Sequence, residues 1–145
     1  MRVFLLEDEA VRIGVFLRIL GAHTDPGDVI HHATDVDSAL RVWEPPYDLL
    51  LLDHDLGGQQ MAESHEYNTG YQFLVRVHEQ VGRTLAIVHS WNPSGAWALM
   101  SLLRSIGAIP ARHAFDPQTF ELLLPHYIHS IKVRNGERRE VDAQA

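Results

Sequence analysis

The chain has 145 residues, of which 46% are hydrophobic, so it is long and apolar enough for one globular domain with its own core. Its formal net charge of −7 argues against a broad electrostatic surface for nucleic acid or an anionic membrane. The absence of cysteine excludes disulfides, thiolate zinc sites and thiol nucleophiles.

The first half of the chain alternates strand and helix patterns. Residues 1–6 form a short, nearly continuous apolar run, which is typical of a strand that is buried on both faces. The patterns that follow are a helix at 10–20, a weaker strand at 29–33, a helix at 35–43 and the clearest strand at 47–52. Asp35 is a suitable N-cap for the second helix, and the prolines at 45 and 46 stop it.

The second half repeats the alternation. Further patterns predict a helix at 69–81, a strand at 84–88, a helix at 92–107, a strand at 109–113 and a helix from 116 to about 131. Two of these helices begin with a capping residue followed by proline, at Asn92-Pro93 and Asp116-Pro117. We expect Pro125 to kink or interrupt the last helix.

Domain organisation follows from the same patterns. Residues 1–132 form a single α/β domain, and the charged, apolar-poor residues 133–145 are expected to be a flexible tail. Because the chain shows neither a signal peptide nor a membrane-spanning run, we expect a cytoplasmic protein without a membrane partner.

Five strands alternating with five helices predict a parallel sheet with helices on both faces. In such sheets ligands bind outside the carboxyl ends of the strands. The polar residues that follow the predicted strands are Glu7, Asp8, Asp53, His54, Asp55, His89, Ser90, Arg112 and His113.

The four carboxylates Glu7, Asp8, Asp53 and Asp55 are the core of the predicted site. Two like charges about 4 Å apart repel by roughly 4 kcal/mol at an effective dielectric constant near 20, so they need a shared proton, a lysine or a divalent cation. All-oxygen ligation suits Mg²⁺, Mn²⁺ or Ca²⁺, whereas nearby imidazoles favour Mn²⁺, Fe²⁺ or Zn²⁺. We favour Mg²⁺ or Mn²⁺. The alternative is that the two acidic stretches only stabilise a helix N-terminus and a turn.

Two histidines stand beside these carboxylates. His89 ends a strand and could act as a general acid, a base or a ligand. His54 lies between two aspartates that favour its charged form, which suits proton donation or contact with a phosphate. The alternatives are an exposed loop residue for His54 and a hydrogen-bonded structural residue for His89. Tyr71 and Trp91 could stack on a base, or serve as a rim residue and a loop anchor.

The segment 57–68 is the longest stretch without a regular pattern. Long loops in compact α/β domains are usually functional covers or disordered. Since it carries Glu63, His65 and Glu66, this segment is a candidate cover over the site.

Residues 2 to 125 resemble bacterial receiver domains. The segment Phe4–Glu9 is similar to their first strand with its acidic pair, and Tyr47–Asp53 to the strand that carries their phosphoacceptor aspartate. The resemblance implies a flavodoxin-like topology with strand order 2-1-3-4-5. Two departures are His89, where receivers place Thr or Ser, and His113, where they place Lys.

A narrower resemblance rests on Leu52–Gly57 (LDHDLG), Thr69–Tyr71 (TGY) and Val88–Pro93 (VHSWNP). These motifs are similar to those of the cyclic-phosphate processing receiver domains of bacterial and phage conflict systems. In that family D-H-D-L-G and H-S-x-N-P are the proposed active site.

Together these features predict a metal-dependent phosphoesterase that acts on cyclic (2′,3′-type) or terminal phosphates of nucleotides or RNA. The expected residues are His54, His89 and Asp53 for catalysis, Glu7, Asp8, Asp53 and Asp55 for the metal, and Ser90, Asn92, His113 and Tyr71 for the phosphate or substrate. The alternative is a signalling or partner-binding receiver, with Asp53 as the phosphoacceptor and a protein as the partner.

Overall fold

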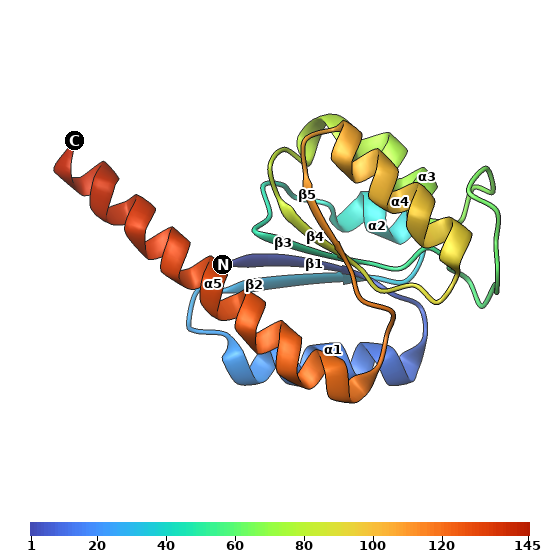
Figure 1. Cartoon of the computed structure of the whole chain (residues 1–145), viewed down its shortest axis with the longest axis horizontal. Helices are drawn as coiled ribbons and strands as arrows, with labels where there is room; N and C mark the ends of the chain where they lie inside the picture. Colours follow the sequence, from blue (N-terminus) through green and yellow to red (C-terminus); the bar gives the residue numbers. More distant parts are fainter.

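The computed structural model describes all 145 residues and alternates strands with helices along the whole chain (Figure 1). The strands are β1 (Arg2–Leu6), β2 (Val29–Ala33), β3 (Leu49–Leu52), β4 (Leu85–Val88) and β5 (Ile109–Arg112). The helices are α1 (Ala10–His23), α2 (Val36–Val42), α3 (Gly70–Val77) with the short 3₁₀ turn η1 (His78–Gln80), α4 (Pro93–Ser105) and α5 (Pro117–Gln144). Except at the C-terminus, the predicted bounds agree to within a few residues.

The five strands form one parallel sheet in the order β2-β1-β3-β4-β5, which confirms the predicted topology. The register aligns the strand ends, because Leu6 pairs with Leu52 and Leu52 with Val88. Backbone hydrogen bonds continue the pairing by one residue: Asp53 N donates to Leu6 O at 3.0 Å, and His89 N donates to Leu52 O at 3.1 Å. The residues that follow β1, β3 and β4 are therefore held side by side.

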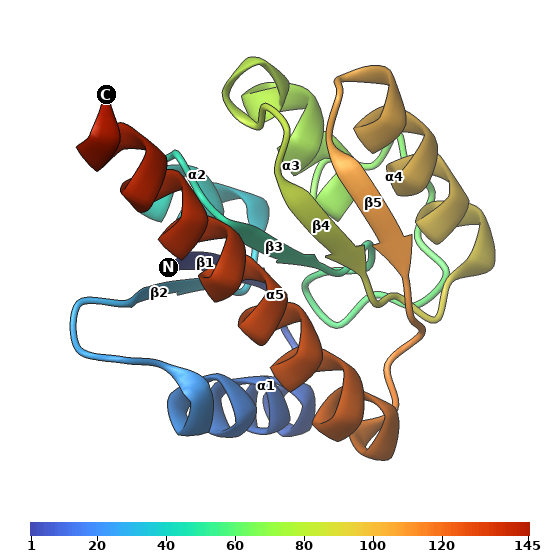
Figure 2. The ribbon, with the colours of Figure 1, turned by 60° about the vertical axis from the view of Figure 1, so that its left-hand side comes forward.

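Helices cover both faces of the sheet, with α1 and α5 on one face and α2, α3 and α4 on the other (Figure 2). This explains the continuous apolar runs, since alternate residues of each strand enter different cores. Phe4 and Leu6 pack with α2, α3 and α4, whereas Val3 and Leu5 pack with α1 and α5. Packing on both faces holds the strands in place. The polar residues follow the strands at their carboxyl ends.

The C-terminal helix differs from the prediction. It continues through Pro125 as one element and extends to Gln144, where a tail was expected from residue 133. Leu124 and Ile128 are buried on either side of Pro125, and their packing offsets the roughly 3 kcal/mol that proline costs inside a helix. Residues 136–145 are exposed but include Arg, Glu, Gln and Ala, which are good helix formers, while Arg134 and Asn135 are half-buried. The flexibility of residues 133–145 stays a prediction.

No helix of the structure combines the length and the apolar character needed to cross a membrane.

Alanine substitutions at two glycines would test how tightly the carboxyl edge of the sheet is packed. A Cβ on Gly95, in the first turn of α4, would lie 2.4 Å from the His54 ring, whereas a Cβ on the exposed Gly14 of α1 meets nothing within 4 Å. We expect Gly95→Ala to lower the free energy of unfolding by about 1–3 kcal/mol through overpacking. Gly14→Ala should raise it by about 0.5–1 kcal/mol through helix propensity. Urea denaturation of both variants measures the difference, and equal effects would contradict the packing.

Candidate functional site

Buried polar side chains gather at the carboxyl edge of the sheet. The protein buries eight polar or charged residues: Glu7, Asp53, His54, Thr69, Thr84, His89, Ser90 and Asn92. All except Thr84 lie just after β1, β3 or β4, or at the start of α3 or α4. Buried polar and charged groups are uncommon unless they are hydrogen-bonded or paired, and their concentration at one edge makes this edge the candidate functional site.

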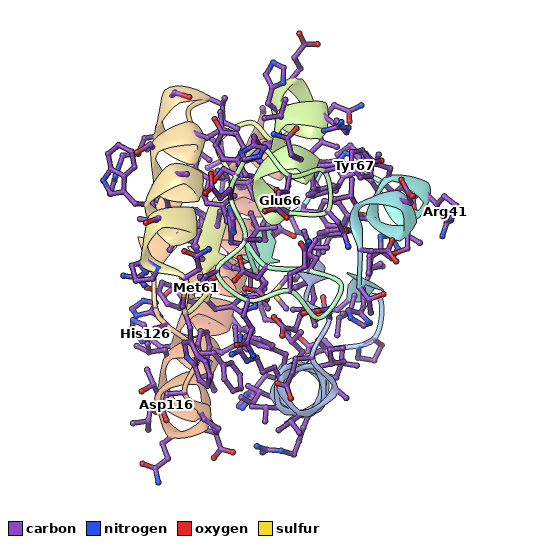
Figure 3. The ribbon with its side chains drawn as sticks, turned by 90° about the vertical axis from the view of Figure 1, so that its right-hand side faces the viewer. Arg41, Met61, Glu66, Tyr67, Asp116 and His126 are labelled. Carbon is purple, nitrogen blue, oxygen red and sulfur yellow. The ribbon has the colours of Figure 1, made fainter.

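A pocket of about 650 Å³ opens at this edge. Its lining residues are Glu7, Asp8, Glu9, Val11, Arg12, Asp53, Asp55, Gly58, Gln59, Gln60, Met61, Ser90, Trp91, Asn92, Phe115, Asp116 and Pro117. Figure 3 faces this edge, with the loop that carries Met61 in front of the sheet and Asp116 at the start of α5. The volume is in the range of pockets that bind small molecules.

Glu7 and His89 form a buried pair behind the pocket. His89 Nε2 lies 2.7 Å from Glu7 Oε2, and both side chains are 0% exposed. Burial raises the pKa of Glu7 to about 7 and lowers the pKa of His89 to about 4, because each loses the water that would stabilise its charged form. The His89 ring packs 4.7 Å from the Phe16 ring, so it holds Glu7 from the core side.

Asp53 is the second buried carboxylate of the pocket, with 3% of its surface exposed. Burial raises its pKa to about 7; the Glu7 charge adds to the rise, while His89 opposes it. The backbone N–H of His54 donates to Asp53 Oδ1 at 2.8 Å, and Gly70 packs against the Asp53 carbonyl so closely that a Cβ there would lie 1.9 Å from the oxygen. Asp53 is therefore fixed from both sides.

The His54 side chain does not line the pocket and instead joins a polar network with Asp55, Ser64 and Asn92. Its Nδ1 lies 2.6 Å from Asp55 Oδ1, and its Nε2 lies 2.9 Å from the Ser64 hydroxyl. Asn92 donates through Nδ2 to the same Asp55 oxygen at 3.0 Å, while its Oδ1 caps α4 by accepting from Gly95 N at 3.0 Å. This network orders Asp55 and the start of α4.

The loop 57–68 is folded over the site, as its length predicted. Gly58 N donates to Asp8 Oδ2 and Met61 N donates to Asp55 Oδ2, both at 2.7 Å. The carbonyl of Ala62 accepts from Asn92 Nδ2 at 2.9 Å. The side of the loop that lines the pocket is residues 58–61, whereas the expected Glu63, His65 and Glu66 lie outside the lining.

The structure divides the predicted site residues into two groups. Those that line the pocket are Glu7, Asp8, Asp53, Asp55, Ser90 and Asn92. Those that do not are His54, His89, His113 and Tyr71. His113 Nε2 contacts the Tyr127 hydroxyl at 2.9 Å, and Tyr71 packs against the core under α2, α3 and α4. Direct contact of these four with a ligand in the pocket therefore finds no support in the geometry.

Sequence analysis missed Arg12, which lines the pocket from the first turn of α1. The only signal available was its place one helical turn after the acidic stretch at Glu7–Glu9, and no motif marks it. Trp91 is confirmed as a loop anchor, because its Nε1 donates to Phe115 O at 2.8 Å, yet 58% of its surface stays exposed.

The acidic groups fit a divalent cation. One ligand atom each from Glu7, Asp53 and His89 lie within 4.8 Å of one another, which is close to the span of ligands around a single ion. His89 already contacts Glu7 and does not line the pocket, so the atoms that face the pocket are carboxylate oxygens. Of the other predicted ligands, Asp8 has one oxygen held by Gly58, whereas both oxygens of Asp55 are hydrogen-bonded within the protein.

The fold is that of receiver domains. The chain matches the signal receiver domain of a putative LuxO repressor protein from Vibrio parahaemolyticus at 17% identity and a TM-score of 0.59, covering 92% of this chain and 94% of that one. It matches the response regulator domain of Thermotoga maritima CheB at 18% identity and a TM-score of 0.59, covering 90% of this chain and 95% of that one. A CheY-like receiver from Methanospirillum hungatei JF-1 is similar at 12% identity and a TM-score of 0.56, covering 92% and 97%.

The family is narrower than the fold. The family model described as "Cyclic-phosphate processing Receiver domain" matches residues 3–105, which is more than half of the chain. The chain therefore belongs to the cyclic-phosphate processing receiver domain family, as its motifs predicted. No curated protein matches it.

The buried charge of Asp53 predicts a pH dependence of stability. A folded-state pKa of about 7 lies above the unfolded value of about 4, so the protonated form stabilises the fold below pH 4, and this contribution is lost as the pH rises through 7. In metal-free protein at pH 8, Asp53→Asn should therefore raise the free energy of unfolding by on the order of 2 kcal/mol, and by much less at pH 4.5. Urea denaturation at both pH values tests this, and a variant that is less stable at pH 8 would contradict it.

Proposed function

We propose that this receiver domain is a divalent-cation-dependent phosphoesterase whose reaction centre is the pocket above Glu7 and Asp53. One observation carries the proposal: two buried carboxylates face a ligand-sized pocket, and the one cationic side chain in its lining, Arg12, approaches Glu7 only to 4.0 Å. A shared Mg²⁺ or Mn²⁺ would remove the cost of keeping both ionised. The family description supports a cyclic phosphate as the substrate.

The acidic residues of the pocket and Ser90 then have roles that follow from their positions. Glu7 and Asp53 hold the cation, and Asp8, with one oxygen free of protein partners, stands beside them. When bound, the cation supplies Lewis-acid polarisation of the phosphoryl oxygen. Ser90, which lines the pocket, offers its hydroxyl to another oxygen of the phosphate.

The two histidines act through carboxylates rather than on the substrate. His89 fixes the rotamer of Glu7 through a 2.7 Å contact, and His54 fixes Asp55 through a 2.6 Å contact. Hydrolysis of a cyclic phosphodiester adds one water. The water oxygen bonds to phosphorus and one P–O ester bond breaks; one proton of the water ends on the leaving oxygen, and the other stays with the phosphomonoester product. Asp8 is the pocket carboxylate best placed to receive the proton from the attacking water, because one of its oxygens has no partner.

A second function is favoured by the position of Asp53. It follows the middle strand β3 and lines the pocket, as the phosphoacceptor does in the receiver domains that the chain resembles. Under this alternative Asp53 would carry a phosphoryl group and the protein would signal through a partner. The lysine that such receivers place after β5 is replaced by His113, which contacts Tyr127 instead.

Hydrolysis assays separate the two functions. The protein is incubated with Mg²⁺ or Mn²⁺ and a panel of 2′,3′-cyclic and 3′,5′-cyclic nucleotides and RNA with 2′,3′-cyclic ends. We expect cation-dependent turnover that falls at least about 100-fold in kcat/KM in Glu7→Gln and in Asp53→Asn, which corresponds to about 2.7 kcal/mol of transition-state stabilisation. Glu79→Gln, exposed on η1, is the matched control and should keep full activity.

The same assay includes His54→Ala and His89→Ala, which should lower kcat by displacing Asp55 and Glu7. The proposal fails if no substrate is turned over while acetyl phosphate adds one stable phosphoryl group to Asp53, as measured by intact mass and peptide mapping. That outcome would assign the signalling function instead.

A further inference from the structure

Arg12 is the only cationic side chain that lines the pocket. The same lining carries six carboxylates, from Glu7, Asp8, Glu9, Asp53, Asp55 and Asp116. A phosphate ester is itself anionic, so a ligand of this class enters against a strongly negative field unless positive charge meets it. A divalent cation could supply this positive charge. Among the side chains that line the pocket, only Arg12 does so.

Aromatic rings hold the Arg12 guanidinium in place. It lies 4.1 Å from the centre of the Trp91 ring and 5.2 Å from the centre of the Phe115 ring. Trp91 is itself fixed by the hydrogen bond from Nε1 to Phe115 O. Stacking against ring faces leaves the in-plane N–H groups of a guanidinium available, and it keeps the group from moving with solvent.

The Arg12 guanidinium makes two long ion pairs but no hydrogen bond to a protein acceptor. Its Nη1 lies 4.0 Å from Glu7 Oε1, and its Nε lies 3.4 Å from Glu9 Oε2. Charge-assisted hydrogen bonds between such groups are about 2.7–2.9 Å long, so both contacts are loose. With 13% of its side chain exposed, Arg12 is held at the pocket but free to bind an anion there.

We propose that Arg12 binds the phosphoryl oxygens of the ligand, and that it replaces from α1 the lysine that other receivers carry after β5. At the end of β5 this chain has Arg112, which is exposed and outside the pocket, followed by His113, which contacts Tyr127. This role of Arg12 rests on one part of the proposed function, namely that a phosphoryl group binds in the pocket. It holds equally for an ester substrate and for a phosphoryl group carried on Asp53.

Two phosphoryl probes test the assignment in the presence of Mg²⁺. Inorganic phosphate imitates a free ligand, and trifluoroberyllate imitates a phosphoryl group on an aspartate. Binding is followed by ³¹P and ¹⁹F NMR for the wild type, Arg12→Gln, Arg12→Lys and Arg18→Gln. Arg18 is the matched control, because it lies on the same helix but is exposed and pairs with Glu121.

We expect at least one probe to bind the wild type and Arg18→Gln equally, and to bind Arg12→Gln at least about tenfold more weakly, since charged hydrogen bonds are lost. Arg12→Lys keeps the charge but not the planar fork, so it should fall between them. Trp91→Ala removes the ring beneath the guanidinium and should bind several-fold more weakly. Trp91→Phe keeps a ring but loses the hydrogen bond to Phe115 O, so its affinity should fall between those of Trp91→Ala and the wild type. Thermal melting confirms that each variant is folded.

Equal affinity of Arg12→Gln and the wild type, or no binding of either probe to the wild type, would overturn the assignment. Probe binding that depends on Arg12 in a protein without hydrolytic activity would reject the phosphoesterase and leave Arg12 as the phosphoryl-binding residue. The two proposals therefore fail by different results.

Discussion

Glu7 and Asp53 are held side by side at the carboxyl edge of the sheet, away from water, and this constraint shapes the pocket around them. The parallel register places them next to each other, because each follows a strand whose end is aligned with its neighbour. Burial raises the pKa of each to about 7, so near neutral pH the fold keeps two carboxyl groups close to ionisation with little solvent to screen them. The proposed shared cation would resolve the conflict, and both carboxylates line the pocket through which such an ion would enter.

The surrounding residues divide into those that present groups to the pocket and those that hold these groups in place. His89 and His54 belong to the second kind, since each contacts one carboxylate and neither lines the pocket. Positioning of this kind matters because a reacting group misplaced by about 1 Å can cost a large part of the rate. The histidines of the D-H-D and H-S-x-N-P motifs thus support the site from inside the protein, and Arg12 supplies from α1 the positive charge that the motifs lack.

Much of the fold could be predicted from the sequence, because its signals are local. Continuous apolar runs marked the strands, and the caps expected at Asp35, Asn92 and Asp116 are present. The secondary structure of residues 133–145 could not be predicted, since Arg, Glu and Gln suit both a solvated tail and an exposed helix. The carboxylates could be predicted from strand ends alone. The direction of His54 could not, because it depends on the space left by Gly95, a residue far away in the sequence.

Anomalous diffraction from crystals soaked in Mn²⁺ tests most directly whether Glu7 and Asp53 share one divalent cation. We expect a single manganese peak within bonding distance of a carboxylate oxygen from each residue, and no such peak in Asp53→Asn crystals. An empty site between the two carboxylates at saturating Mn²⁺, or manganese bound only elsewhere on the protein, would contradict it.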